Sequence, residues 1–243
     1  MKLWRFATGL LAIALVLAGI VMVSQQGGGD PPKPADAEPV HSVQGALGGR
    51  QAAELEVVNG VESVIIHSEA MDGVLYRAST LPGSKVAPVA EEAGDTVRLR
   101  LTGTEVAGQA TVHVYLNATV RWQLKLAGGG LRQVVDFAGG RLAGVEVLAG
   151  VQELEVTVPK PEGTLPIHVG GVGRLTVHAP AGPPAQLTLG AQGTIGEVRL
   201  DAQTKQNVPG GTTIAGDGWA AAADRYALQV DTAAAAVSLD RTS

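Results

Sequence analysis

The sequence has no cysteine, few aromatic residues and little charge, and each shortage excludes a class of protein. Its 243 residues include 0 Cys, 3% aromatic residues and 17% charged residues. Without cysteine there is no disulfide framework, thiolate metal site, iron–sulfur cluster, thiol catalysis or lipid attachment through an N-terminal cysteine. The 18 basic and 23 acidic residues give a formal net charge of −5. Because no long basic run accompanies that charge, nucleic acid is not an expected partner.

The chain is instead rich in aliphatic residues and glycine. Hydrophobic residues make up 45% of it, and there are 33 glycines. That apolar fraction is too high for a disordered protein. The composition therefore indicates a folded protein built mainly from small and aliphatic side chains.

The first residues predict a membrane segment. Residues 7–23 are uncharged and follow Lys2 and Arg5, with Trp4 where an interfacial aromatic would anchor a helix. At 1.5 Å per residue the run covers about 26 Å, close to the roughly 30 Å hydrocarbon core. Cleavable signal peptides have apolar regions of about 7–15 residues that end at a small-x-small site. We therefore favour a retained single-pass anchor over residues 1–24, with a removed signal peptide as the alternative.

The charges around this run predict its orientation. Lys2 and Arg5 precede it, whereas Asp30 and Asp36 follow it. The positive-inside rule then places the N-terminus in the cytoplasm and the rest of the chain outside, so we expect a plasma-membrane protein with an extracytoplasmic C-terminal domain. Residues 25–50 are rich in proline and glycine, which predicts a solvated linker.

Residues 51–243 read as a single β domain. Residues 53–58 alternate apolar and polar side chains, and Asn59-Gly60 between two such runs predicts a hairpin turn. The segment 82–95 is punctuated by proline and glycine and predicts an exposed loop. No helix of ordinary length is expected after the anchor, and residues 233–236 are interpreted as a compact turn between two closing strands.

Short apolar strands recur after Trp122 between glycine-rich corners. Equivalent positions recur about every 21 residues, with two strands per repeat. This pattern indicates a β-solenoid in which each repeat adds one coil and small corner residues let the coils stack closely. An antiparallel β-sandwich, with strands about every 8–12 residues, is the alternative. The two series of equivalent positions are Leu124, Val145, Ile167 and Leu187, and Val135, Leu154, Leu175 and Val198.

Several stretches carry a resemblance to a known family. They are residues 120–129 (VRWQLKLAGG) with the strand-then-glycine units after them, residues 216–219 with 224–226, and residues 237–241. They resemble membrane-anchored bacterial proteins with a toast-rack-like, adhesin-like β domain, over roughly residues 50–243. The resemblance implies a β-solenoid at the cell envelope, and relatives of the domain occur on envelope-stress regulators. It includes no catalytic motif, so it implies no reaction.

The titratable side chains do not form a recognisable site. Metal binding needs converging ligands, but His168 and His178 are expected on different sheets and facing solvent, as is His113. His41 and His67 are the other two histidines of the chain. The carboxylates are spread one per strand, which argues against an opposed catalytic pair, although Glu146 and His168 are about one coil apart. These carboxylates are Asp136, Glu146, Glu155, Glu197 and Asp201.

The remaining motifs also have structural interpretations. Residues 128–132 lack the Gly-Lys-Ser/Thr ending of a phosphate loop, so their glycines are interpreted as corner residues. The glycosylation triplet Asn117-Ala118-Thr119 is interpreted as accidental in a bacterial chain. Tyr115 and Trp122 are expected in the core or a cap, which leaves no aromatic platform for glycans. No catalytic, cofactor-binding or metal-binding residue is predicted, and no cofactor is expected.

These observations predict an all-β chain, a toast-rack-like β-solenoid following an N-terminal transmembrane helix, with a β-sandwich as the alternative. The expected function is not enzymatic. We expect an adhesin-like domain that presents an interaction surface to an envelope protein or polymer, held to the membrane through residues 7–23. The alternative is an accessory or regulatory subunit that binds another membrane protein in envelope-stress sensing.

Overall fold

The folded part of the chain consists of strands and turns. The computed structural model describes residues 40–242, and no helix occurs among them. This confirms the all-β prediction. The predicted anchor lies outside the described residues, and within residues 40–242 no helix is long and apolar enough to cross a membrane. The strands form two sheets, one of ten strands (sheet A) and one of nine (sheet B).

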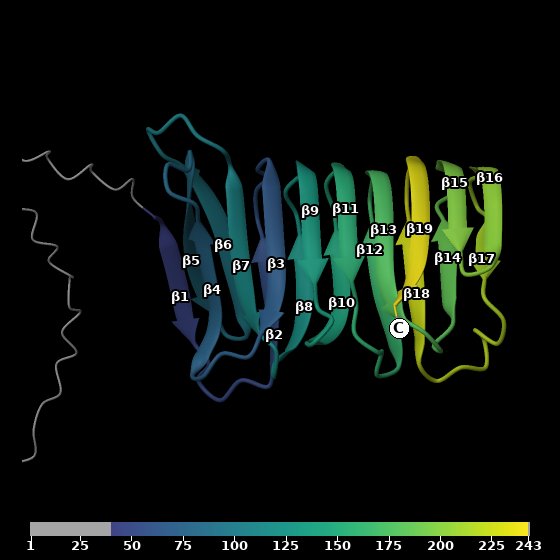
Figure 1. Ribbon diagram of the computed structural model, residues 1–243, viewed down its shortest axis with the longest axis horizontal. Helices are drawn as coiled ribbons and strands as arrows, with labels where there is room; N and C mark the ends of the chain where they lie inside the picture. The colour runs from purple at the N-terminus through teal and green to yellow at the C-terminus, as the bar shows by residue number, and fades with distance from the viewer. Residues whose placement is uncertain (1–39, 243) are drawn as a thin grey trace, which may run out of the picture. The chain divides into compact units, whose positions relative to one another are not determined.

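Both sheets extend along the longest axis of this folded unit (Figure 1). In spatial order, sheet A contains β1 (Ser42–Ala46), β4 (Val74–Thr80), β7 (Thr111–Asn117), β3 (Ser63–Glu69), β9 (Gly130–Asp136), β11 (Val151–Thr157), β13 (Val172–Pro180), β19 (Ala234–Thr242), β15 (Thr194–Leu200) and β16 (Gln203–Pro209). Sheet B contains β17 (Thr213–Ala215), β14 (Ala185–Leu189), β18 (Arg225–Val230), β12 (Thr164–Val169), β10 (Arg141–Val147), β8 (Arg121–Leu126), β2 (Ala52–Val57), β6 (Thr96–Gly103) and β5 (Val86–Ala93).

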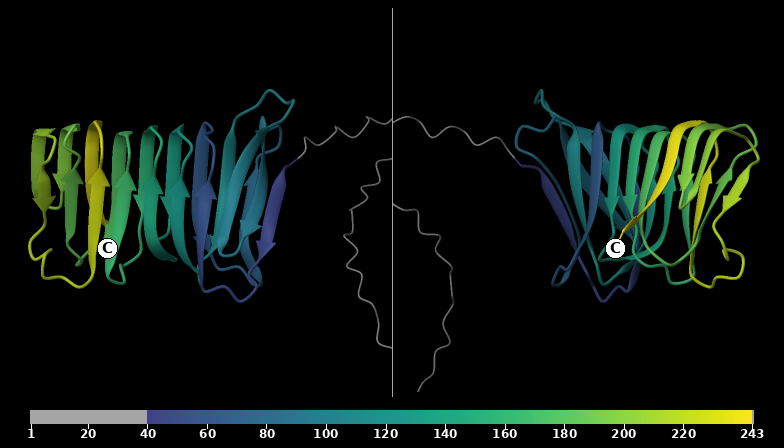
Figure 2. Two further views of the ribbon diagram at one scale, coloured as in Figure 1. Left: turned by 180° about the vertical axis from the view of Figure 1, so that it is seen from behind. Right: turned by 45° about the vertical axis from the view of Figure 1, so that its right-hand side comes forward.

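Most of the chain alternates between the two sheets, so that consecutive strands form a coil with one strand in each. Thus β8 lies in sheet B and β9 in sheet A, and the pairs β10–β11 and β12–β13 follow in the same way. Neighbouring coils pair in parallel, with Leu124 beside Val145 and Val145 beside Ile167. The spacing of these three residues in the sequence therefore predicted their register. Figure 2 shows the coils from two further directions.

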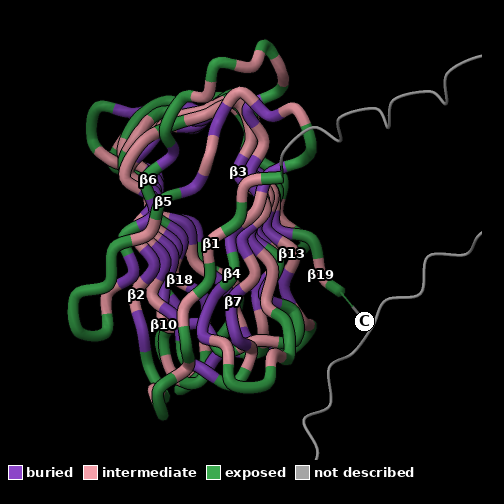
Figure 3. Tube along the Cα trace, turned by 90° about the vertical axis from the view of Figure 1, so that its left-hand side faces the viewer, coloured by how far each residue is buried: buried purple, intermediate pink, exposed green. Residues whose placement is uncertain are grey.

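The core lies between the two sheets. Alternate side chains of each strand point inward, and these buried positions line the facing layers in Figure 3. Leu124 and Ile167 are fully buried, and Val145 is 1% exposed. Trp122 is also buried, as expected, and its indole Nε1 donates to the backbone oxygen of Asn117 at 3.0 Å. Aliphatic residues suffice because the space between two flat sheets is about 10 Å thick.

Glycine lets the corners of successive coils lie in contact. A Cβ on Gly60 would stand 2.0 Å from the carbonyl oxygen of Gly129, and a Cβ on Gly129 would stand 2.7 Å from that of Gly150. Gly128 is equally confined, because its Cβ would be 2.1 Å from the carbonyl carbon of Asn59. Any larger residue would push these coils apart, as the glycine-rich corners in the sequence predict.

The order of the coils in space differs from their order in the chain. The coil β18–β19 lies between β12–β13 and β14–β15, so Leu228 separates Ile167 from Leu187. Val237 likewise separates Leu175 from Val198. The predicted direct succession of these positions is wrong, because a coil from the end of the described chain occupies the place between them.

One predicted equivalence is also displaced along the strand. Val135 pairs with Val156, and Leu154 pairs with Gln133, so Val135 and Leu154 are not partners. The sequence pattern misled because Gln133 is a polar residue at an inward position. It is only 2% exposed, and its side-chain nitrogen donates to the backbone oxygen of Gly128 at 2.8 Å.

Antiparallel strands close both ends of the stack. At one end β5 pairs with β6 and β4 pairs with β7, while β1 covers β4. At the other end β16 pairs with β15 and β17 pairs with β14. The loop predicted over 82–95 is therefore wrong for Val86–Ala93, which forms the edge strand β5. The C-terminal half of this strand is mostly exposed. Strand β1 similarly falls within the range 25–50 predicted as linker.

Two predicted turns are also replaced by other structure. Strands β2 and β3 lie in different sheets, so Asn59-Gly60 does not close a hairpin. Instead the Asn59 amide bonds the neighbouring coil, donating to Leu101 O at 2.7 Å and accepting from Leu101 N at 2.9 Å. The alanines 234–236, predicted as a turn, begin strand β19, because the register with β13 and β15 continues through Ala236.

Candidate functional site

Every second side chain of each strand points away from the core and forms rows across the outer faces of the sheets. The histidines predicted to face solvent lie in these rows. His113 and His178 lie on sheet A, and His168 lies on sheet B, all partly exposed. No group of three or more His, Asp or Glu side chains within residues 40–242 could hold a metal ion.

Planar side chains gather on sheet A near the end where β1 lies. In register across β4, β7 and β3 stand Arg77, Tyr115 and His67. The Arg77 guanidinium lies 4.8 Å from the centroid of the Tyr115 ring, and that ring stacks on His67 with 5.2 Å between centroids. His67 stacks in turn on His113 at 6.1 Å, with only 5° between the ring planes. We call these four residues the sheet-A aromatic row.

Neighbouring strands and neighbouring rings fix the position of each residue in this row. Parallel strands fix the spacing of the backbones, and stacking fixes the ring planes. Arg77 also pairs with Glu69 at 3.5 Å. Burial, together with the neighbouring His67, lowers the pKa of His113, which favours its neutral form. The row is therefore a half-exposed surface of flat rings, with the Arg77 guanidinium, paired with Glu69, at one edge.

Alternation along β7 could have predicted which way Tyr115 points. Tyr115 lies between the buried residues Val114 and Leu116, so it must point outward. The prediction that Tyr115 belongs to the core or a cap is therefore wrong, although it holds for Trp122. The stacking of His67 and His113 was not predictable, because it depends on which strands become neighbours.

A row of alternating charges crosses sheet B. Glu56, Lys125, Glu146 and His168 are registered neighbours on β2, β8, β10 and β12, and Arg98 precedes them on β6. Arg98 bonds Glu56 at 2.9 Å, and Lys125 lies 3.5 Å from the same carboxylate. The hydrogen bond from Arg98 lowers the pKa of Glu56. Opposite charges on adjacent strands favour this register over a shifted one.

The row ends in a cluster around His168. Its Nε2 lies 2.7 Å from an Asp231 oxygen, and its Nδ1 lies 3.9 Å from Glu146. Gln229 donates to the other oxygen of Asp231 at 2.8 Å. This hydrogen bond, together with the contact with His168, lowers the pKa of the Asp231 carboxyl against the opposing effect of burial. The expected proximity of Glu146 and His168 is thus a lateral contact between coils, which fits a stabilising role.

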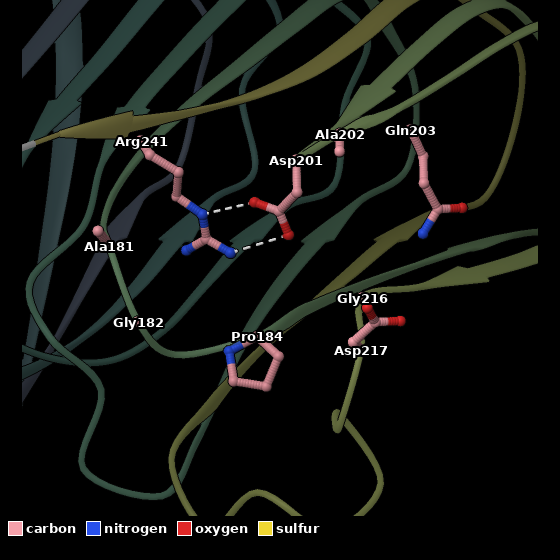
Figure 4. A pocket seen from close by; sticks show the side chains of 9 residues that line it. All are labelled: Ala181, Gly182, Pro184, Asp201, Ala202, Gln203, Gly216, Asp217 and Arg241. Carbon is pink, nitrogen blue, oxygen red and sulfur yellow. Dashed lines mark hydrogen bonds and ion pairs between the residues drawn. The ribbon is translucent and has the colours of Figure 1, made fainter.

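A cleft of about 520 Å³ lies at the end of the stack opposite β1, where the connection 181–184, the turn 201–203 and residues 216–217 meet β19. Figure 4 shows Asp201 projecting toward Arg241 across it. Arg241 binds Asp201 through two hydrogen bonds, of 2.6 and 3.1 Å, and donates to Pro180 O at 3.1 Å. Because these groups satisfy one another, the cleft is bridged by its own ion pair.

The other motifs have structural roles. Asn117 is 1% exposed, and its amide nitrogen donates to the backbone oxygens of Met71 and Val74, each at 2.6 Å. A sugar could not be attached to that nitrogen without breaking both bonds, so the glycosylation triplet is structural. Gly128 serves coil contact, as expected for a corner residue.

Comparison with known proteins links the chain to solved structures through its fold. No family model matches the sequence, and no curated protein matches it either. A putative cell adhesion protein from Clostridium sporogenes ATCC 15579 superposes with a TM-score of 0.55 at 16% identity, covering 84% of this chain and 99% of that one. A putative adhesin from Bacteroides fragilis NCTC 9343 gives a TM-score of 0.23 at 9% identity, covering 85% and 99%. The first likeness concerns the fold alone, and the second score does not establish a common fold.

Proposed function

We propose that this chain is a membrane-anchored, extracytoplasmic and non-enzymatic β-solenoid that presents an interaction surface at the cell envelope, in an adhesin-like role. The observation that carries the proposal is the sheet-A aromatic row. Tyrosine and arginine are enriched where binding energy concentrates, and rigid rings lose little conformational entropy when they bind. The partner would lie against the face formed by Arg77, Tyr115, His67 and His113.

Two further observations support this function. The fold resembles that of a structure described as a putative cell adhesion protein. The stack also favours a solenoid over a sandwich, because neighbouring coils pair in parallel and the chain changes sheet at nearly every corner. Sandwiches are built mainly from antiparallel strands. The resulting flat faces keep outward side chains in fixed positions.

Orientation across the membrane can be tested because the natural chain has 0 Cys. The variant Thr204→Cys places a near-isosteric thiol at an exposed position of β16. A membrane-impermeant thiol reagent should label it in intact cells. The matched variant Leu3→Cys should react only after lysis. Labelling of position 204 only after lysis would contradict the extracytoplasmic placement.

The partner can be sought by cross-linking the full-length protein in its own cells and purifying it from membranes. A defined envelope protein or polymer should co-purify, and Tyr115→Ala should reduce its yield while Thr188→Ala on sheet B should not. Capture that depends on residues 1–24 but is unaffected at Tyr115 would favour the accessory-subunit alternative. Capture that is reduced by neither substitution and does not depend on residues 1–24 would overturn both the adhesin-like function and the accessory-subunit alternative.

A further inference from the structure

The coil β18–β19 comes last among the described strands but lies inside the stack. In sheet B, β18 is flanked by β12 and β14, and in sheet A, β19 is flanked by β13 and β15 (Figure 1, yellow between green). All four pairings are parallel. Among the described strands β14 and β15 pair with no strand of the preceding coils, so this coil alone joins β14–β17 to the rest of the two sheets. Without it β12, β13, β14 and β15 would each have an unpaired edge, and we call its place between them the slot.

The coil fits this slot through its core side chains. Leu228 packs in register between Ile167 and Leu187, and it is 2% exposed. Tyr226 is fully buried, and its hydroxyl donates to Pro159 O at 3.1 Å. Burial raises the pKa of Tyr226 to about 12, so the hydroxyl keeps its proton for that bond. The core side chains of the inserted coil thus continue the buried layers of the coils on either side.

Polar contacts hold the coil on both sides. Asp231 contacts His168 on the β12 side, and Thr232 donates from its hydroxyl to Gly170 O at 2.8 Å. On the β15–β16 side Arg241 spans the cleft to Asp201. The cleft therefore marks the seam where the inserted coil meets the end of the stack.

The inserted coil pairs with strands that lie farther away in the sequence than the partners of the coils just before it. Arg225 and its partner Thr164 are 61 residues apart, whereas the preceding coils meet partners about 21 residues away. Contacts of greater sequence separation close more slowly, because more chain must be ordered first. Within the described residues, the coil is joined to the stack through 216–224, a mostly exposed segment rich in glycine and alanine.

We propose that during folding this slot accepts the β18–β19 coil of a second copy of the chain, so that two chains exchange coils reciprocally. Each slot is then filled with the same contacts as in the monomer, and the dimer has two-fold symmetry. Trp219 and the segment around it move with the coil, because the indole Nε1 donates to Tyr226 O at 2.9 Å. Exchange accompanies folding, since withdrawal of a placed coil would expose its buried side chains. The inference does not depend on the proposed function.

Engineered disulfides distinguish the two arrangements in the full chain. The Ser238 hydroxyl lies 3.5 Å from that of Thr176 on the neighbouring strand β13. Backbones of paired strands are about 4.8 Å apart, within the range that a disulfide spans. The double variant Thr176→Cys/Ser238→Cys should link within one chain in the monomer and between two chains after exchange. The control Ser63→Cys/Thr111→Cys joins β3 to β7, which remain in the same chain in both arrangements.

Each variant is unfolded and refolded in detergent with reductant at increasing protein concentration, then diluted, oxidised and separated on a non-reducing gel. The 176/238 dimer band should rise with refolding concentration, while the 63/111 variant stays monomeric. Linkage within one chain at every concentration would overturn the proposal, as would equal dimer bands in both variants. A second measurement needs no substitution. Two differently tagged full-length chains should co-purify when refolded together, but not when mixed after folding, and failure to co-purify after joint refolding would also overturn it.

Discussion

At the scale of the residue, alternation along each strand determines which side chains are buried. It correctly predicted inward Leu124, Val145 and Ile167, and outward His113. It could not predict that Gln133 is buried. A buried glutamine needs a hydrogen-bond partner, and here the backbone carbonyl of Gly128 at a corner accepts a hydrogen bond from its amide nitrogen. Inward aliphatic residues should therefore dominate stability, whereas outward ones should matter little.

Truncation of a core leucine tests this difference. Leu124→Ala leaves a cavity between two sheets that cannot close around it, and should lower the free energy of unfolding by about 2–5 kcal/mol. The matched variant Leu131→Ala changes a side chain that is 58% exposed, and should cost less than about 0.5 kcal/mol. Denaturant titration of both variants measures the effect. Similar losses would contradict the assignment of Leu124 to the core.

The depressed pKa of Asp231 predicts a pH dependence. Gln229 and His168 stabilise the charged carboxylate in the folded state. Its contribution is therefore present above the unfolded pKa, near 3.9, and is lost as pH falls through the lower folded value. Asp231→Asn should flatten the fall of unfolding free energy below about pH 4. Asp72→Asn, at an exposed turn, is the control and should leave the acid limb unchanged. An acid limb identical in Asp231→Asn and wild type would refute the role of this carboxylate.

At the scale of the element, the sequence revealed strands more reliably than their partners. Strands that alternate over several residues, such as β8 and β12, were predicted, whereas the edge strands β1, β5, β16 and β17 were missed. Edge strands pack on one side only and carry residues such as Pro88 and Lys205 that discourage further pairing. Asn59-Gly60 misled for a different reason, since its hairpin signal was overridden by pairing of both flanking strands with other coils.

The corner contacts of the coils give a prediction at this scale. Gly128→Ala would place a methyl group within 2.1 Å of the backbone at Asn59 and Gly60, which cannot move without separating two coils. We expect a loss of about 1–3 kcal/mol in unfolding free energy, the usual effect of overpacking. Gly139→Ala is the matched control, because nothing lies within 4 Å of its added Cβ. Thermal unfolding compares the two, and equal stability would contradict close stacking of the corners.

At the scale of the whole molecule, the sequence repeat could not determine the order of the stack. A period of about 21 residues predicts that coils pack on one another, but β18–β19 has the same alternation as its neighbours and gives no sign that it is inserted. The site was equally hidden, because the sheet-A aromatic row combines strands β4, β7 and β3, whose order in space differs from that in the chain.

The folded unit should not need its N-terminal segment. Deletion of residues 1–26 is expected to give a soluble, monomeric, β-rich protein, because the described core is closed at both ends by antiparallel strands. Circular dichroism and size-exclusion chromatography with light scattering, on protein folded at low concentration, measure this. A helical or unfolded spectrum would contradict the fold.

The central claim, that the sheet-A aromatic row is the face that meets a partner at the envelope, is tested most directly by position-specific photo-cross-linking. A photoreactive residue replaces Tyr115 on sheet A or, as the matched control, Thr188 on the outer face of sheet B. Illumination of intact cells should produce one discrete covalent adduct from position 115 and much less from position 188. Equal adducts from both positions, or adducts from position 188 alone, would contradict the claim.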